Sequence, residues 1–154
     1  MVDSHGTLNH IFLCGGIGHW MWKHLVGLTP AAAGFARIKI APQFHDTIGP
    51  KTVSGVFLSP KGKISSRWRV SHGNVQLTVS LPVGVEGAAI HVPKPTIAGK
   101  PAKAVEVTLD GKVIWNGVKL VGKTDGIISA SDEHGGISFI TTNGHFSFES
   151  KTKR

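Results

Sequence analysis

The chain has 154 residues, of which 40% are hydrophobic and only 17% are charged. This length suits one domain with a sizeable core, since domains commonly run about 100 to 150 residues. With 20 glycines and 8 prolines, the composition favours short strands and tight turns over a helical bundle, and it excludes a largely disordered chain.

The formal net charge of +8 raises the question of an anionic partner. Basic residues are spread singly along the chain, however, and the only tight group is Lys151, Lys153 and Arg154, which we interpret as a solvated tail. Specific nucleic-acid binding uses clustered Lys and Arg against phosphate, so it is not favoured. Binding of a polyanion through net charge alone is retained as a third hypothesis for function.

Cys14 is the only cysteine, which excludes an intrachain disulfide and a cysteine-based zinc cluster and favours a reducing compartment such as the cytoplasm. Residues 1–10 lack the basic and then apolar pattern of a secretory leader. No apolar run approaches the roughly 20 residues of a membrane-spanning helix, so we expect no membrane partner.

Residues 11–28 are predicted to form the one good helix, because Ile17, Met21, Leu25 and Leu28 recur at helical spacing. Thr29-Pro30 is expected to end it, since the residue before a proline avoids the α region.

Three glycines and two tryptophans indicate how this helix packs. The glycines at 15, 16 and 18 weaken its first half, so close packing against them is expected. Trp20 and Trp22 lie two residues apart and therefore point to nearly opposite faces. Both faces of the helix are thus expected to need partners.

After Pro30 the hydrophobic pattern has period two, with turn residues such as Asp110-Gly111 and Asn143-Gly144 between short runs. The predicted strands are residues 36–40, 52–58, 64–70, 75–81, 88–92, 104–109, 112–115, 127–129, 136–141 and 145–149. We predict a mostly β fold, an antiparallel β-sandwich with one N-terminal α-helix packed on it. Residues 1–30 would form the helical segment and 31–154 the sandwich, with residues 93–101 crossing between its sheets.

Ordinary glycoside hydrolysis needs two carboxylates that flank the scissile bond. Most of the nine acidic residues are expected in turns or at outward strand positions: Asp3, Asp46, Glu86, Glu106, Asp110, Asp125, Asp132, Glu133 and Glu149. No G-x-S-x-G elbow is present, and Cys14 lies in an apolar helix, where a thiol is usually inert. Catalysis by this chain alone is therefore not expected.

Metal and cofactor sites are not expected either. His10, His19 and His24 are nine and five residues apart, which does not match the i, i+4 spacing of helical zinc ligands. The glycine-rich residues 14–18 follow no strand and precede no Lys-Ser or Lys-Thr pair, so they do not form a phosphate-binding loop.

Two tryptophans of the strand region receive different interpretations. Trp68 alternates with Ile64, Ser66 and Val70 and is expected in the sandwich interior. Trp115 ends the Asp110-Gly111 hairpin and is expected to be the most exposed tryptophan, a candidate for stacking on a sugar ring.

The order of several motifs resembles the junction between the catalytic (α/α)₆ barrel and the C-terminal domain of bacterial α-L-rhamnosidases of glycoside hydrolase family 78. Thr7-Leu8-Asn9-His10 resembles the family's Ser-x-Asn-His, and residues 15–22 (GGIGHWMW) resemble the start of its last barrel helix. Residues 27–30, 34–35 and 38–42 resemble the glycine, the Pro-Gly-Phe segment and the first sandwich strand. Residues 59–64 with Trp68 resemble its Pro-x-Gly-x-Ile hairpin, and residues 142–148 its closing strand.

This resemblance implies an inverting hydrolase family that acts on terminal α-L-rhamnose, with acid and base carboxylates in barrel segments that precede Met1. It implies that His10, beside Asn9, matches a histidine that lines the rhamnose subsite. We therefore expect a non-catalytic β-sandwich domain with residual carbohydrate binding through His10, Asn9 and Trp115. The alternative is an assembly module that forms a homo-oligomer or completes a split glycosidase through its apolar N-terminal helix.

Overall fold

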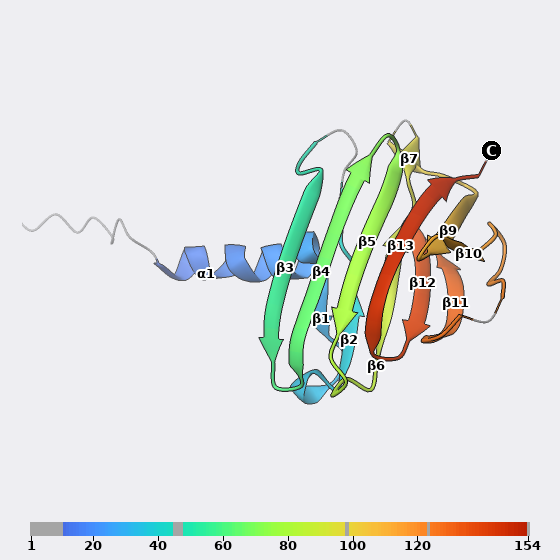
Figure 1. Ribbon diagram of the computed structural model, residues 1–154. Helices are drawn as coiled ribbons and strands as arrows, with labels where there is room; N and C mark the ends of the chain where they lie inside the picture. Colours follow the sequence, from blue (N-terminus) through green and yellow to red (C-terminus); the bar gives the residue numbers. More distant parts are fainter. Residues whose placement is uncertain (1–10, 45–47, 98, 123, 154) are drawn as a thin grey trace, which may run out of the picture.

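The computed structural model describes residues 11–44, 48–97, 99–122 and 124–153. Two β-sheets are stacked face to face, and a helix leads into one side of the stack (Figure 1). The predicted fold class, a mostly β antiparallel sandwich with one N-terminal helix, is confirmed.

The first sheet has five strands in the order β1-β2-β6-β12-β11. All of its neighbours are antiparallel except β2 and β6, which run parallel. A short 3₁₀ turn, Ala33–Phe35, lies between β1 and β2. The strands are β1 (Leu28–Pro30), β2 (Arg37–Ile40), β6 (Gly87–Pro93), β12 (Gly136–Thr141) and β11 (Ile127–Glu133).

The second sheet has six antiparallel strands in the order β10-β9-β13-β5-β4-β3. They are β10 (Lys112–Trp115), β9 (Val105–Leu109), β13 (Gly144–Thr152), β5 (Asn74–Leu81), β4 (Gly62–Ser71) and β3 (Thr52–Ser59). Residues 93–101 connect β6 of the first sheet to β9 of the second, as predicted, and they contain a small ribbon of β7 (Thr96–Ile97) and β8 (Lys100–Pro101).

The predicted strands form because side chains alternate between the core and solvent. In β4, Ile64, Ser66 and Trp68 are buried, while Arg67 before Trp68 and Arg69 after it are exposed. Two rings join the sheets, since Phe139 of β12 and Phe148 of β13 stack with centroids 5.1 Å apart. Trp68 is 1% exposed and belongs to the interior, as expected.

Trp115 is also buried, which contradicts the expectation that it is exposed. Its side chain is only 3% exposed and belongs to the hydrophobic core. The pairing of β10 with β9 shifts register between Val113 and Trp115. This irregularity breaks the alternation, so that Ile114 and Trp115 both face inward although they are consecutive.

The helix ends earlier than predicted. It consists of α1 (Ile11–Trp20) and a π-helical turn, Met21–Val26. Gly27 ends it in the left-handed conformation, with φ 80° and its N–H bonded to the Trp22 carbonyl. Thr29-Pro30, expected to end the helix, instead belongs to β1.

Gly27 also has no room for a side chain. A Cβ at this position would lie 2.2 Å from the nitrogen of Pro42 and 2.5 Å from the carbonyl carbon of Ala41. Backbone atoms of a packed strand end cannot move away cheaply. Gly27 therefore meets two demands at once, a positive φ and a close backbone approach.

We predict that Gly27→Ala lowers the free energy of unfolding by about 2 to 4 kcal/mol, because left-handed strain and overpacking add. Gly111→Ala is the matched control, since Gly111 has φ 81° but nothing within 4 Å of its Cβ position. That control should lose only about 1 kcal/mol. Urea denaturation with an unchanged m-value measures both losses; equal losses would show that the contact with Pro42 is unimportant.

Candidate functional site

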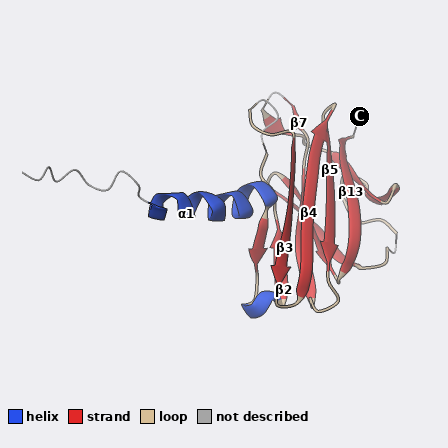
Figure 2. Ribbon diagram, turned by 60° about the vertical axis from the view of Figure 1, so that its left-hand side comes forward, coloured by secondary structure: helices blue, strands red, loops and turns tan. Residues whose placement is uncertain are grey.

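The N-terminal helix projects away from the sandwich and contacts it only at its last turn (Figures 1 and 2). The turn Met21–Val26 touches β1, the edge strand of the first sheet, and β3 and β4 at the edge of the second. It therefore covers the open side of the sandwich between the two edge strands.

Hydrogen bonds hold this turn in place. The last carbonyls of a helix lack partners within the helix and need donors from elsewhere. The sandwich supplies a donor to each of three carbonyls. The backbone N–H of Gln43 donates to His24 O at 2.8 Å, Trp68 Nε1 to Leu25 O at 2.6 Å and Ser66 Oγ to Val26 O at 3.0 Å. Two of these donors are side chains whose strand positions face the core.

Packing at the same turn depends on a second glycine. The Trp22 ring lies edge-on to Phe57 of β3, with centroids 5.7 Å apart. A Cβ on Gly55 would lie 2.7 Å from Val26 Cγ1 and 2.9 Å from Trp22 Cζ3. Gly55 therefore leaves the space that Trp22 and Val26 fill, and one of the two predicted helix faces has its partner in the sandwich itself.

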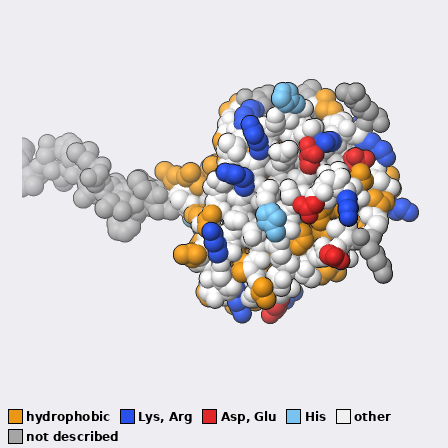
Figure 3. Space-filling view, in the orientation of Figure 1, with side chains coloured by type: hydrophobic (Ala, Val, Ile, Leu, Met, Phe, Trp, Pro, Cys, Tyr) orange, Lys and Arg blue, Asp and Glu red, His pale blue; other side chains and the backbone are white. Residues whose placement is uncertain are grey.

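The rest of the helix surface is open. Ile17, Trp20 and Met21 are 60%, 52% and 48% exposed, respectively. Nothing lies within 4 Å of the Cβ positions of Gly16 and Gly18, so the expected close packing against these glycines is absent from the described residues. Hydrophobic side chains are visible where the helix leaves the sandwich (Figure 3). This apolar surface is the part of the molecule best suited to contact another structure.

Of the three residues predicted to contact sugar, the structure describes Trp115. Asn9 and His10 lie outside the described residues. Trp115 is buried in the core, so it offers no ring face to a ligand.

Two of the described carboxylates are bound to lysine side chains. Asp132 forms an ion pair with Lys94, with Asp132 Oδ1 2.6 Å from Lys94 Nζ, and Glu149 forms one with Lys151 at 2.9 Å. Asp110 occupies the expected hairpin turn at φ 48°. Asp132 and Glu133, expected in a turn, instead end β11. Asp3 and Asp46 lie outside the described residues.

The outer face of the five-stranded sheet carries a polar cleft of about 470 Å³. Its polar side chains come from β2, β6, β11 and the loops beside them, and Phe44 adds an aromatic wall. The polar groups are Lys39, Gln43, His91, Lys94, Thr96, Glu133 and His134. The cleft contains one carboxylate, that of Glu133, so it lacks an acid and base pair.

His91 is the central titratable group of this cleft. Its Nδ1 lies 3.1 Å from Ser138 Oγ and 3.6 Å from Glu133 Oε2. Burial lowers the pKa of His91 below 6.5, and Lys39 and Lys94 lower it further, although Glu133 partly opposes them. The lowered pKa favours the neutral imidazole.

Sequence reasoning did not find this cleft. His91 occupies an outward position of a predicted strand, which is a weak signal by itself. Its partners Ser138 and Glu133 lie on β12 and β11, more than 40 residues later in the chain, and only the sheet order places them beside it.

The described residues contain no group of three or more His, Cys, Asp or Glu that could hold a metal ion. Among the helices that the structure describes, none has the length and apolar character needed to cross a lipid bilayer.

The described chain is thus a two-sheet sandwich with an exposed apolar helix at its open edge. The family model of the bacterial α-L-rhamnosidase C-terminal domain matches residues 27–105. The chain therefore belongs to this family, as the motif order in the sequence indicated.

Individual relatives are similar over part of the chain. An α-L-rhamnosidase of Streptomyces avermitilis is 30% identical over 76 residues, which is 49% of this chain and 7% of the relative. One of Formosa agariphila is 32% identical over 87 residues, 56% of this chain and 9% of the relative. The matched segments thus cover less than a tenth of the length of either enzyme.

A solved α-L-rhamnosidase structure from Dictyoglumus thermophilum has a similar fold. It superposes with a TM-score of 0.70 at 18% identity and covers 90% of this chain and 14% of that one. At this identity the likeness extends to the fold alone.

We predict that His91 makes stability depend on pH. Its pKa is lowered in the folded state, so the unfolded chain binds more protons below pH 6.5. The free energy of unfolding should therefore fall as the pH drops from 6.5 through the lowered pKa. Urea denaturation at a series of pH values measures this slope. His91→Asn should flatten it, whereas His145→Asn, at an exposed position of β13, should not; an unchanged slope in His91→Asn would contradict the prediction.

Proposed function

We propose that this chain is a non-catalytic β-sandwich module of a rhamnosidase-like protein of glycoside hydrolase family 78. In this proposal residues 1–30 supply the last helix of a catalytic (α/α)₆ barrel and residues 31–154 supply the scaffold that holds this helix. The observation that carries it is the helix whose carbonyls are capped by the sandwich while Ile17, Trp20 and Met21 remain exposed.

The direction of the helix supports a docking role. Three hydrogen bonds from the sandwich hold its last turn, so its exposed part leaves the core in a defined direction. Covering an apolar helix surface with a partner stabilises the complex by about 25 cal/mol for each Å² removed from water. Open glycines at 16 and 18 would let a neighbouring helix approach closely. A barrel of helices is a partner with this shape.

The carboxylates support a non-catalytic role. Inverting hydrolysis needs an acid and a base about 6.5 to 9.5 Å apart with room for a water between them. In the described residues, Glu133 is the one carboxylate that lines the polar cleft, and Asp132 beside it is bound to Lys94. The acid and base would therefore come from the barrel.

We retain His10 and Asn9 as proposed sugar contacts, on the motif resemblance alone. Carbohydrate would then be bound at the junction with the barrel, where residues 1–10 lead into the exposed helix. Trp115 is withdrawn from this proposal because it is a core residue.

The direct test is turnover of an aryl α-L-rhamnoside by the purified chain. We expect no turnover above buffer, because the acid and base pair would be missing; an active rhamnosidase serves as the positive control. Turnover that persists through purification and is lost in Glu133→Gln would contradict the proposal and place catalysis in the polar cleft.

A second candidate function is assembly through the same helix. Its exposed Ile17 and Trp20 could be covered by a second copy of the chain where no barrel is available. A homo-oligomer would then form through pairing of the helices.

We predict that Ile17→Ser/Trp20→Ser shifts the chain from oligomer to monomer in sedimentation velocity, since these side chains would form the interface. The control Val56→Ser/Leu58→Ser removes apolar side chains of 53% and 79% exposure from β3 and should leave the oligomer intact. A wild-type chain that stays monomeric at high concentration would reject assembly and leave the non-catalytic module.

A further inference from the structure

We propose that the outer face of the six-stranded sheet binds an acidic saccharide, through the guanidinium groups of Arg67 and Arg69. This site lies apart from the helix and from the polar cleft, and it goes beyond the function proposed above.

Charged residues are unevenly distributed over the outer face of the six-stranded sheet. No acidic residue occurs between Asp46 and Glu86, and the neighbouring strands β3, β4 and β5 all lie within this range. Several Lys and Arg side chains lie over β3 and β4, whereas the acidic side chains of this face lie mostly toward β13, together with further Lys and Arg (Figure 3). The surface of β3 and β4 therefore carries basic side chains with few acidic ones beside them.

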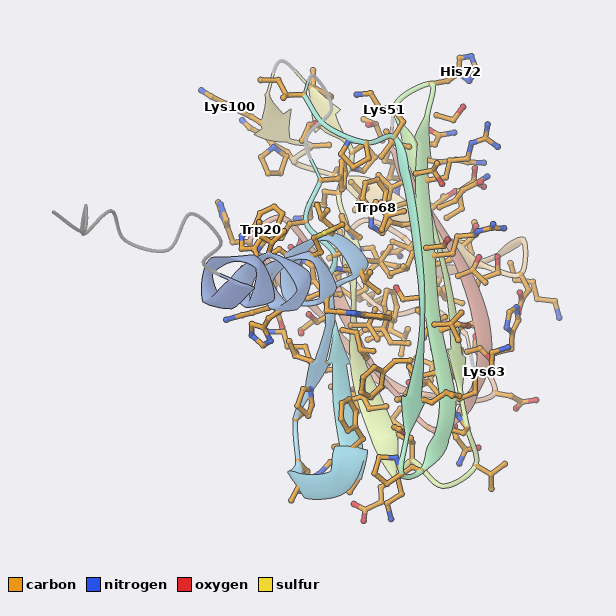
Figure 4. The ribbon with its side chains drawn as sticks, turned by 90° about the vertical axis from the view of Figure 1, so that its left-hand side faces the viewer. Trp20, Lys51, Lys63, Trp68, His72 and Lys100 are labelled. Carbon is orange, nitrogen blue, oxygen red and sulfur yellow. The ribbon has the colours of Figure 1, made fainter. Side chains whose placement is uncertain are left out.

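The direction of each side chain follows from strand alternation. Trp68 points between the sheets, and Lys63 lies on the opposite, outer side of β4 (Figure 4). Arg67 and Arg69 share the outer side with Lys63, and all three are exposed. Since a strand rises about 3.3 Å per residue, the two arginines start about 7 Å apart.

The sheet register surrounds the arginines with neutral polar side chains. Arg69 lies between Thr52 of β3 and Gln76 of β5, and Arg67 pairs with Thr78 of β5. These five residues line a shallow groove of about 440 Å³. The groove therefore has two cationic forks, two hydroxyls and one amide, and none of its lining residues is acidic.

Neither arginine is neutralised by a neighbouring carboxylate. Within the described residues, Asp132 is bound to Lys94 and Glu149 to Lys151, while Glu133 lies beside His91. Glu149 of β13 is the cross-strand partner of Gln76 on β5, and its carboxylate is bound to Lys151 at 2.9 Å. The guanidinium groups of Arg67 and Arg69 are thus available to an anionic ligand.

The chemistry of the groove selects the ligand class. A guanidinium binds carboxylate or sulfate through two parallel hydrogen bonds. Threonine hydroxyls and a glutamine amide both donate and accept, which suits the hydroxyls of a sugar ring. Single-stranded nucleic acid binding generally uses aromatic side chains to stack bases, and none of the five lining residues is aromatic. The combination fits a saccharide that carries a carboxylate or sulfate group.

The test is isothermal titration of the full chain with oligogalacturonate at low ionic strength, with neutral dextran and a short DNA duplex as comparison ligands. We expect oligogalacturonate to bind, dextran not to bind and DNA to bind more weakly. Arg67→Ser/Arg69→Ser should lower the affinity for oligogalacturonate at least about tenfold, because the charge-assisted hydrogen bonds of both arginines are lost. Arg67→Lys/Arg69→Lys keeps the charge without the fork and should lose less.

A charge-matched control separates the groove from net charge. Lys100→Ser/Lys103→Ser removes two exposed positive charges from β8 and the residues after it, outside the groove. We expect this variant to change affinity less than about threefold, since screened distant charges contribute little. The urea midpoint of each variant confirms that it is folded.

Three results would overturn the proposal. The first is no binding of oligogalacturonate by the wild-type chain. The second is an equal loss of affinity in the lysine control, which would assign binding to net charge. The third is tighter binding of the DNA duplex than of oligogalacturonate, lost in the arginine variant, which would assign the groove to nucleic acid.

Discussion

The hydrogen bonds from the sandwich to the last helical carbonyls are the constraint on which the rest of the structure depends. A two-sheet sandwich has open sides between its edge strands, and here the turn Met21–Val26 closes one of them between β1 and β3. Trp68 and Ser66 supply donors from within the core, so the same side chains fill the interior and terminate the helix. The direction in which the helix leaves the sandwich is thereby tied to core packing, and the docking proposed for its exposed part depends on this coupling.

Much of the sandwich could be predicted because its determinants are local. Alternating burial and glycine turns place the strands correctly, and Trp68 is found in the interior. The errors occur where contacts with other parts of the chain accompany the local conformation. The helix ends at Gly27, where Ala41 and Pro42 come close to the backbone, and Trp115 turns inward where β10 shifts register against β9. Periodicity within one segment cannot detect either contact.

The candidate sites show the same division. The helix could be singled out from its own residues, whereas the polar cleft is made by strands far apart in the chain. The arginine groove is made by the consecutive strands β3, β4 and β5, and strand alternation places Arg67 and Arg69 on one surface without acidic neighbours on β3 and β5. Of the terminal group expected as a solvated tail, Lys151 pairs with Glu149 and Lys153, which is exposed, donates to Asn116 O. A charge pattern therefore has to be assessed on the surface that the fold creates.

The turn that closes the sandwich also bears on where this family's domain begins. The family match starts at Gly27, yet Val26 is a member of the hydrophobic core at 8% exposure and its carbonyl is bonded to Ser66. A fragment cut at the matched boundary would lose the residues that cover the space between β1 and β3. Its edge strands would then be free to pair with other chains, which is a common route to aggregation. At its N-terminal boundary the matched segment is thus shorter than the packed structure by one turn of helix.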